Sequence, residues 1–416
     1  MIKAVNKVVV NSMHLIVGMD IGKFHNVVIG LKPDSRFTKA VTLNNNLKGY
    51  MELLAQIKIW ERESSCHRSI VAMESTAHYW EIPARWLRSK GIQVVQVNAL
   101  HTKRAKEIED NSPGKTDKKD ARIIAQLVRY GKYLQCILPE GAIADLRELV
   151  RIRQHIVNEL TEKRNYLQRL TDSVFPELFS IFKKSYGKTV LHLLKEYPLP
   201  DDIIKAGPEE IKQRLRRKRL NLITTRIQKV CEAAQNTIGF KEATDAYRIA
   251  IQYTAKRIIE LQQHLHHIEK SMAISLTKVS EARYILSLKG IGVVTAAMIV
   301  GETGGLCNYS NAEQVLKLAG LNLYEMSSGR YKGKARITKR GRPLLRHAFF
   351  ILATLQCRKG MLFYEKYRQL LNRGMAKVKA IVTISRKLCR LIFALVRDKR
   401  LFSIEPPELF HSRMAA

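Results

Sequence analysis

Short apolar runs alternate with amphipathic stretches over the first 130 residues, a pattern typical of an α/β domain. Runs rich in β-branched and apolar residues predict strands at 14–22, 26–32, 37–45, 69–75 and 92–98. Apolar residues at helical spacing predict helices over 46–63 and 78–91, and Gly91 closes the second of these. The order predicts a meander of three antiparallel strands that parallel strands continue.

Longer helical patterns follow from about residue 141 to 275. The first keeps its apolar residues on one stripe, Pro198 and Pro200 interrupt the run, and a second stretch covers about 209–274. A helical hairpin or coiled-coil arm fits this pattern, either as a spacer or as an oligomerisation element.

A third region begins near residue 281 with two predicted helices that join at Gly290-Ile291-Gly292. A further helix, a polar loop around 326–341 and helices to about residue 400 follow. The predicted fold is an α/β ribonuclease-H-like (RuvC-like) N-terminal domain, a helical or coiled-coil arm and a mainly α-helical C-terminal domain. The predicted boundaries are 1–135, 136–280 and 281–402, with a tail at 403–416.

The net charge indicates that the protein binds a polyanionic partner. The 416 residues carry a formal charge of +35, and between 331 and 400 there are 20 Lys and Arg residues against two acids. The run over residues 211–230, with eight basic residues and no acids, can be a solvated helix face, but nucleic-acid contact is the stronger interpretation. The expected contacts are Arg214, Arg216, Arg217, Lys218, Arg219, Lys332, Lys334, Arg336, Lys339 and Arg340.

The six cysteines lack the spacing of a zinc site or a disulfide framework, so reduced thiols are expected. The first 20 residues lack a signal-peptide cleavage pattern, and no window of about 18 uninterrupted apolar residues predicts a membrane span. We therefore expect a cytoplasmic protein, associated with the nucleoid when it is bound to DNA.

Four acids are the main candidates for chemistry. Asp20 and Glu74 lie at the ends of apolar strands, while Asp117 and Asp120 share one face at the start of a helical pattern. Crowded carboxylates raise one another's pKa unless a hard cation such as Mg²⁺ or Mn²⁺ neutralises them. Each acid also has a simpler interpretation, as a salt bridge, a turn cap or a favourable charge at a helix N-terminus.

The loop that contains Ser327 and Ser328 is the second candidate. From its residues alone, a basic loop that grips phosphates through backbone N–H groups is preferable to a serine nucleophile, because no local triad is present. His347 is too isolated to change this. The Gly290-Ile291-Gly292 segment fits a phosphate-binding turn and a simple helix–helix turn equally well.

Taken together, the segments resemble the insertion-sequence transposases with an N-terminal DEDD domain and a C-terminal serine domain, also described as bridge-RNA-guided recombinases. The resemblance lies in GMDIGK, AMEST, KTDKKDA, LKGIGVVTAAMIVGE and SSGRYKGKARITKRGRPLLR, which stand in family order. It implies Mg²⁺ (or Mn²⁺) on Asp20, Glu74, Asp117 and Asp120. It also implies a serine that attacks DNA, here Ser328 because it precedes the glycine, with Ser327 in reserve.

The same resemblance implies donor and target DNA, a noncoding guide RNA and a homo-oligomer, dimeric or tetrameric. Two other hypotheses remain open on the residues. One is a metal-dependent, junction-resolvase-like nuclease that uses water, and the other is a nucleic-acid-binding protein without catalysis.

Overall fold

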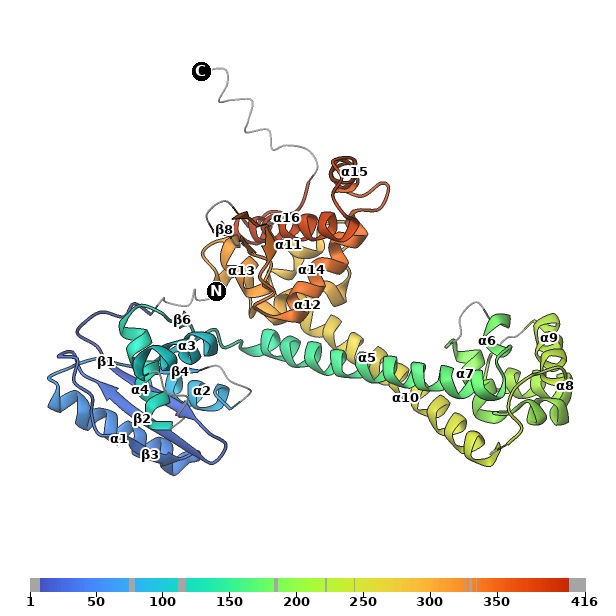
Figure 1. Ribbon diagram of the computed structural model, residues 1–416, viewed down its shortest axis with the longest axis horizontal. Helices are drawn as coiled ribbons and strands as arrows, with labels where there is room; N and C mark the ends of the chain where they lie inside the picture. Colours follow the sequence, from blue (N-terminus) through green and yellow to red (C-terminus); the bar gives the residue numbers. More distant parts are fainter. Residues whose placement is uncertain are drawn as a thin grey trace, which may run out of the picture. The chain divides into compact units, whose positions relative to one another are not determined.

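A computed structural model describes residues 8–74, 79–110, 117–182, 186–220, 223–242, 244–325, 327–328, 331–333 and 335–403. The chain forms two compact units, Met1–Leu138 and Pro139–Ala416 (Figure 1). The predicted tail lies outside the described residues except for Ser403. The predicted three-domain boundaries remain a prediction.

The first unit is built on a mixed six-stranded sheet in the order β3-β2-β1-β4-β5-β6. Its strands are β1 Leu15–Ile21, β2 His25–Leu31, β3 Val41–Asn44, β4 Ser69–Glu74, β5 Gln93–Val97 and β6 Leu134–Gln135. The first three pair antiparallel, and β4 and β5 continue the sheet parallel to β1. The five predicted strands and the meander are confirmed. The two-residue β6 was missed because so short a strand has no period.

Helices cover both faces of this sheet. The cluster that contains Val17 and Met19 packs against α1 Leu47–Glu63 and α2 Glu81–Ser89. The cluster that contains Ile16 and Ala72 packs against α4 Asp117–Arg129, which α3 Ala99–Asp110 adjoins. The predicted helices are present, and α2 ends before Gly91, which has φ +81°. Helix α3 was not predicted, because ALHTKRAKEIED carries few apolar residues.

Two helices of 34 residues, α5 Gly141–Val174 and α10 Thr244–Thr277, dominate the second unit. They pack antiparallel, as the ion pairs Arg153–Glu269 at 2.9 Å and Arg257–Glu159 at 2.8 Å require. The structure thus has an antiparallel pair of long helices but not a simple hairpin, because residues 175–243 and helices α6 to α9 lie between them in sequence. The assignment as a coiled coil stays a prediction.

Shorter helices enclose a separate core at the distal end of this pair, and we call this part the distal lobe (Figure 1). It contains α6 Leu178–Ile181, α7 Lys188–Glu196, α8 Pro200–Arg217 and α9 Thr224–Gln235. The single helical stretch predicted over 209–274 is wrong, since it is divided between α8, α9 and α10. The chain turns at Arg219, with φ +56°, and crosses α5 at Gly239, where an added Cβ would lie 2.0 Å from the Val174 carbonyl oxygen.

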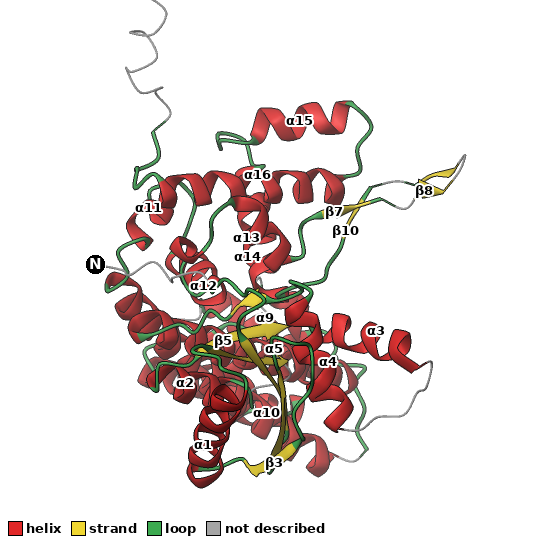
Figure 2. Cartoon of the chain, turned by 90° about the vertical axis from the view of Figure 1, so that its left-hand side faces the viewer, coloured by secondary structure: helices red, strands yellow, loops and turns green. Residues whose placement is uncertain are grey.

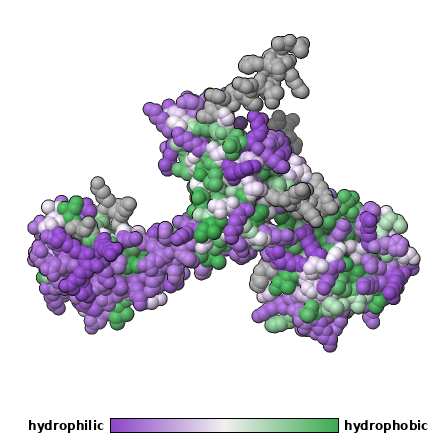
Figure 3. All heavy atoms as spheres, turned by 180° about the vertical axis from the view of Figure 1, so that it is seen from behind, coloured by the Kyte–Doolittle hydropathy of each residue, from purple (hydrophilic) through white to green (hydrophobic). Residues whose placement is uncertain are grey.

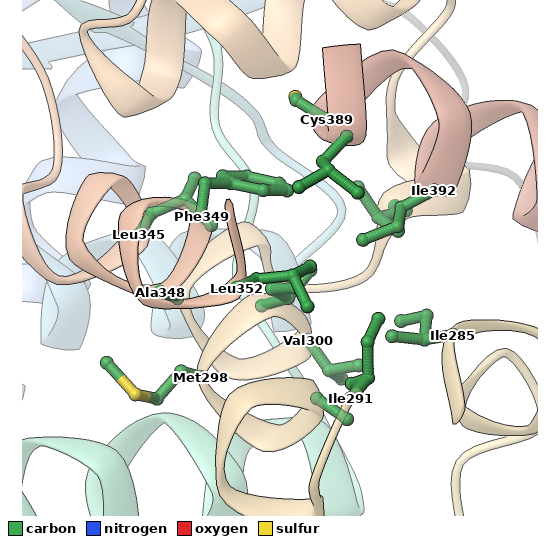
Figure 4. Packing of buried hydrophobic residues seen from close by; sticks show 14 of the residues in the cluster. Ile285, Ile291, Met298, Val300, Leu345, Ala348, Phe349, Leu352, Cys389 and Ile392 are labelled. Atoms are coloured by element: carbon green, nitrogen blue, oxygen red, sulfur yellow. The ribbon is translucent and has the colours of Figure 1, made fainter. Parts of the chain in front are cut away.

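The opposite end of the pair enters a helical lobe formed by residues 279–402, which we call the serine lobe. Its elements include α11 Ala282–Leu286, α12 Val293–Thr303, η1 Leu306–Asn308, α13 Ala312–Ala319, α14 Pro343–Gln356, α15 Tyr364–Asn372 and α16 Lys377–Arg397. Figure 4 shows side chains of α12, α14 and α16 meeting in its core, among them Val300, Leu352 and Ile392. Leu146 and Val150 of α5 belong to the same core.

Among the described residues, no helix is both long enough and apolar enough to cross a membrane. The six cysteines are free thiols.

Candidate active site

The strand register places Asp20 and Glu74 on one face of the sheet. Side chains alternate along a strand, and Ile16 and Ala72 face the cluster with α4. Asp20 and Glu74 have the same parity as these two residues, so both are directed to the α4 face. The parallel pairing Met19↔Met73 brings the two acids beside one another at the carboxyl ends of β1 and β4. Both side chains are half-buried and have partners.

Gly18 allows α4 to approach this face. A Cβ at Gly18 would lie 2.0 Å from the Ala121 carbonyl oxygen and 2.9 Å from the Ala125 nitrogen, so the helix backbone rests directly on β1. Gly18 and Asp20 share a face, and the contact at Ala121 adjoins Asp120. A glycine inside an apolar strand is a sequence signal for such an approach.

The first turn of α4 carries the other two acids. Asp117 is its first residue and is exposed, whereas Asp120 is only 6 % exposed. Negative charge is favourable at a helix N-terminus, so both positions also stabilise the helix.

Arg129 fixes the other end of α4. Its guanidinium donates hydrogen bonds to the carbonyl oxygens of Ser12 at 2.8 Å and Lys32 at 3.0 Å. These bonds tie the helix to the chain that precedes β1 and to the chain that follows β2. The position of the acidic turn over the sheet is thus set at both ends of α4.

The carboxylates are not gathered around one point. Among the described residues, no group of three or more His, Cys, Asp or Glu side chains is positioned to hold a metal ion. Asp120 forms an ion pair with Lys106 of α3 instead. The chemistry of the four acids fits a hard divalent cation, because all supply carboxylate oxygens. The sequence did not indicate Lys106, since α3 was not predicted.

Ser328 lies on a hairpin beyond a two-stranded ribbon of the serine lobe. Strands β7 Leu323–Tyr324 and β10 Arg336–Ile337 form the ribbon, and β8 Ser327–Ser328 pairs with β9 Tyr331–Lys332 farther out (Figure 2). Ser328 is exposed. The structure therefore presents the predicted nucleophile on a protruding segment. Gly329 and Lys334 lie outside the described residues.

Hydrogen bonds from one arginine hold the root of the ribbon, which we define as the two chain segments, or legs, just before β7 and just after β10. Arg346 of α14 donates to the carbonyl oxygens of Ala319 at 3.0 Å, before β7, and of Lys339 at 3.2 Å, after β10. The legs approach closely at Gly320, where an added Cβ would lie 2.8 Å from the Lys339 carbonyl carbon. Thr338 and Asn322 join the legs through a 2.7 Å side-chain hydrogen bond.

A buried acid lies beneath this root. Glu302 of α12 is 5 % exposed and pairs with Arg342, which precedes α14, at 3.6 Å. The neighbouring Tyr309 donates to the Thr303 carbonyl oxygen at 2.7 Å, and burial raises its pKa to about 12. The tyrosine thus stays neutral and acts as a structural donor. His347 lines a cavity of about 340 Å³ between the ribbon root, α14 and α16.

The predicted nucleic-acid contacts are mostly on the surface. Five lie at the end of α8 and the turn that follows it, and Arg214 among them pairs with Glu196 at 3.0 Å. Burial lowers the pKa of nearby His192, and Lys195 and Lys218 lower it further, which indicates a locally positive field. Hydrophilic residues cover most of the distal lobe in Figure 3. In the serine lobe, Arg336, Lys339 and Arg340 are exposed.

Two families of known proteins match this chain, one in its N-terminal part and one in its C-terminal part. A transposase family with the DEDD domain of IS110 matches residues 17–176, and the IS116/IS110/IS902 transposase family matches residues 282–368. The first match covers the sheet except for the first two residues of β1, together with α4 and α5, and the second contains the ribbon and its root. The findings support an insertion-element transposase of the IS110/IS116 family.

Full-length relatives agree with this assignment. The transposase is 26 % identical to an uncharacterized 44.8 kDa protein of insertion element IS116 from Streptomyces clavuligerus, over 94 % of this chain and 96 % of that protein. An IS110 protein of Streptomyces coelicolor is 24 % identical over the same shares. A pilin gene-inverting protein of Moraxella bovis is 23 % identical over 87 % of this chain and 89 % of that protein. The DEDD domain suggests dependence on a divalent metal.

Proposed function

We propose that the transposase cuts and rejoins DNA with Ser328 as nucleophile and with Asp20, Glu74, Asp117 and Asp120 as ligands of Mg²⁺ or Mn²⁺. The observation that carries this proposal is the position of Ser328, exposed on a hairpin beyond a ribbon whose root Arg346 fastens. A phosphate-binding loop needs only backbone N–H groups and cations. A hydroxyl on a fastened, projecting ribbon suits attack on a backbone phosphate.

The sheet supports the other half of the proposal. Its order β3-β2-β1-β4-β5, antiparallel and then parallel, is the one expected for a ribonuclease-H-like fold. Asp20 and Glu74 lie at the ends of adjacent strands on the face that α4 covers. A bound divalent cation supplies charge stabilisation for phosphoryl transfer.

The serine step conserves the phosphodiester. The Ser328 hydroxyl oxygen bonds to phosphorus and its proton leaves to solvent, while one P–O bond to deoxyribose breaks and the released sugar oxygen takes up a proton. The reverse attack by a sugar hydroxyl on the phosphoserine rejoins a strand and restores Ser328. Inversion of a DNA segment, which the name of the Moraxella relatives states, also needs strands to be rejoined.

The proposal includes a noncoding RNA from the element that pairs with donor and target DNA. The protein would then read backbone and shape, and base pairing would read sequence. The charge of +35 supports polyanion binding of this kind. We also propose a homo-oligomer in which the serine of one chain works with the acids of another.

The deciding experiment compares Ser328→Ala with Ser327→Ala on DNA that carries the ends of the element. Mass spectrometry of trapped, digested reactions should find DNA attached to Ser328 in the unchanged protein and in Ser327→Ala. Ser328→Ala should lose cleavage by at least about a thousandfold, as expected when a nucleophile is removed.

Each alternative has its own result. Cleavage that survives in Ser328→Ala without an adduct would support the nuclease that uses water. An adduct at Ser327 would move the nucleophile by one residue.

The metal site is tested by Asp20→Ala, Glu74→Ala, Asp117→Ala and Asp120→Ala, which should abolish cleavage and retain DNA and RNA binding. A mixture of Asp20→Ala and Ser328→Ala proteins should regain activity if the site is shared between chains.

A further inference from the structure

Lys106 and Asp120 form a shielded ion pair near the proposed metal site. The ammonium group of Lys106, on α3, contacts the Asp120 carboxylate, on α4. The side chain of Asp120 is 8 % exposed and that of Lys106 is 22 % exposed. The pair is thus much less hydrated than the more exposed ion pairs of this chain, such as Arg151–Glu148.

A carboxylate as buried as Asp120 needs a compensating positive charge, because an isolated buried charge is strongly destabilising. Lys106 supplies this charge, since it contacts Oδ1 of Asp120. A divalent cation at the proposed site would bind the same carboxylate group. Lys106 and the cation therefore compete for one group.

We propose that Lys106 is a positioning residue that occupies the place of the cation at Asp120 and is displaced when the metal binds. This inference rests on the proposed metal site. Lys106 keeps the buried carboxylate neutralised while the site is empty, so α4 stays packed on β1 through Gly18. Metal binding must first break the ion pair, which weakens the affinity for the metal.

Lysine labelling of the unchanged protein tests the displacement directly. Reductive methylation, quantified by mass spectrometry, should be slow at Lys106 without metal and become several times faster when Mg²⁺ is added. Lys103, exposed on the same helix, is the internal reference and should react equally in both conditions. Equal protection of Lys106 with and without Mg²⁺, in a protein shown to bind the metal, would overturn the proposal.

Mn²⁺ affinity, measured by electron paramagnetic resonance of the free ion, tests the competition. Lys106→Met should bind Mn²⁺ roughly tenfold more tightly, the factor expected when a charge-assisted contact no longer opposes binding. It should also unfold at a lower temperature without metal and gain more from Mn²⁺ than the unchanged protein does. Lys106→Arg, which keeps the charge, and Lys103→Met should leave the affinity unchanged.

The outcomes separate this inference from the metal site on which it rests. Loss of Mn²⁺ binding in Asp20→Asn and Asp120→Asn, together with unchanged affinity in Lys106→Met, would refute only the role of Lys106. Absence of Mn²⁺ binding in the unchanged protein would refute the metal site and the inference together. Mn²⁺ binding that Asp120→Asn does not weaken would show that Lys106–Asp120 is a purely structural pair.

Discussion

Single residues decide how closely α4 can approach the sheet. The positions of Asp20 and Glu74 at strand ends could be predicted, because apolar runs mark the strands and parity marks the face. Gly18 could have been recognised as a close-approach glycine, but its partner Ala121 could not, since no local pattern shows which helix covers a strand. Lys106 could not be found, because its helix has too few apolar residues to be predicted.

Gly18→Ala should destabilise the first unit. The added Cβ would lie 2.0 Å from the Ala121 carbonyl oxygen, a backbone atom that can move only with α4. We expect the free energy of unfolding to fall by about 1–3 kcal/mol, the usual cost of overpacking, and cleavage to be reduced because Asp120 moves with the helix. Chemical denaturation measures the change. The control Gly292→Ala, whose Cβ meets nothing within 4 Å, should change stability much less, and equal stability of both variants would contradict the close approach.

Among the elements, the ribbon differs most from the expectation. The sequence around Ser328 predicted a polar, basic loop, and the structure instead has two ladders of two residues per strand. Such short polar strands carry no period, and their pairing depends on interactions at the root that come from distant positions. Arg346, in the predicted helical region, supplies the main hydrogen bonds.

Arg346→Gln should loosen the ribbon at its root. Each hydrogen bond from a charged donor contributes about 1.5–3 kcal/mol, and the substitution removes one from each leg. We expect the rate of Ser328–DNA adduct formation to fall by about tenfold or more, with DNA affinity nearly unchanged, and proteolysis between residues 323 and 337 to become faster. Arg358→Gln, on an exposed arginine just beyond α14, serves as the control. An unchanged adduct rate in Arg346→Gln would show that other residues aim the ribbon.

At the scale of the whole molecule, the excess of positive charge is the property most directly read from the sequence. The five longer strands and the change from antiparallel to parallel pairing were predicted too, because period-2 and helical patterns alternate clearly over the first 130 residues. The distal lobe was not, since its turns at Arg219 and Gly239 depend on tertiary packing rather than on a proline or a polar run.

Nucleic-acid affinity should fall steeply with salt, and the distal lobe should contribute. Arg216, Arg217 and Lys218 are exposed together at the end of α8. Their replacement by glutamine should flatten the plot of log affinity against log salt by about 2–3, at roughly 0.7–0.9 for each phosphate that is no longer neutralised. Fluorescence anisotropy over a salt series measures the slope. Glutamine at Lys48, Lys58 and Arg62, exposed on α1, removes the same charge, and an equal effect of both sets would mean that only net charge matters.

The continuity of α5 has a consequence for synthesis of the protein. Its residue Arg147 is buried against α12, where it donates to the Gly301 carbonyl oxygen 154 positions later in the chain. At typical elongation rates of about 5–20 residues per second, the ribosome exposes this part of α5 for roughly 8–30 seconds before its partner exists. Leu146 and Val150 are exposed to water during that interval. The same apolar residues are exposed on other nascent chains made from the same mRNA, so neighbouring chains could associate through them. The sheet unit, whose core is complete by Leu138, can fold without that delay.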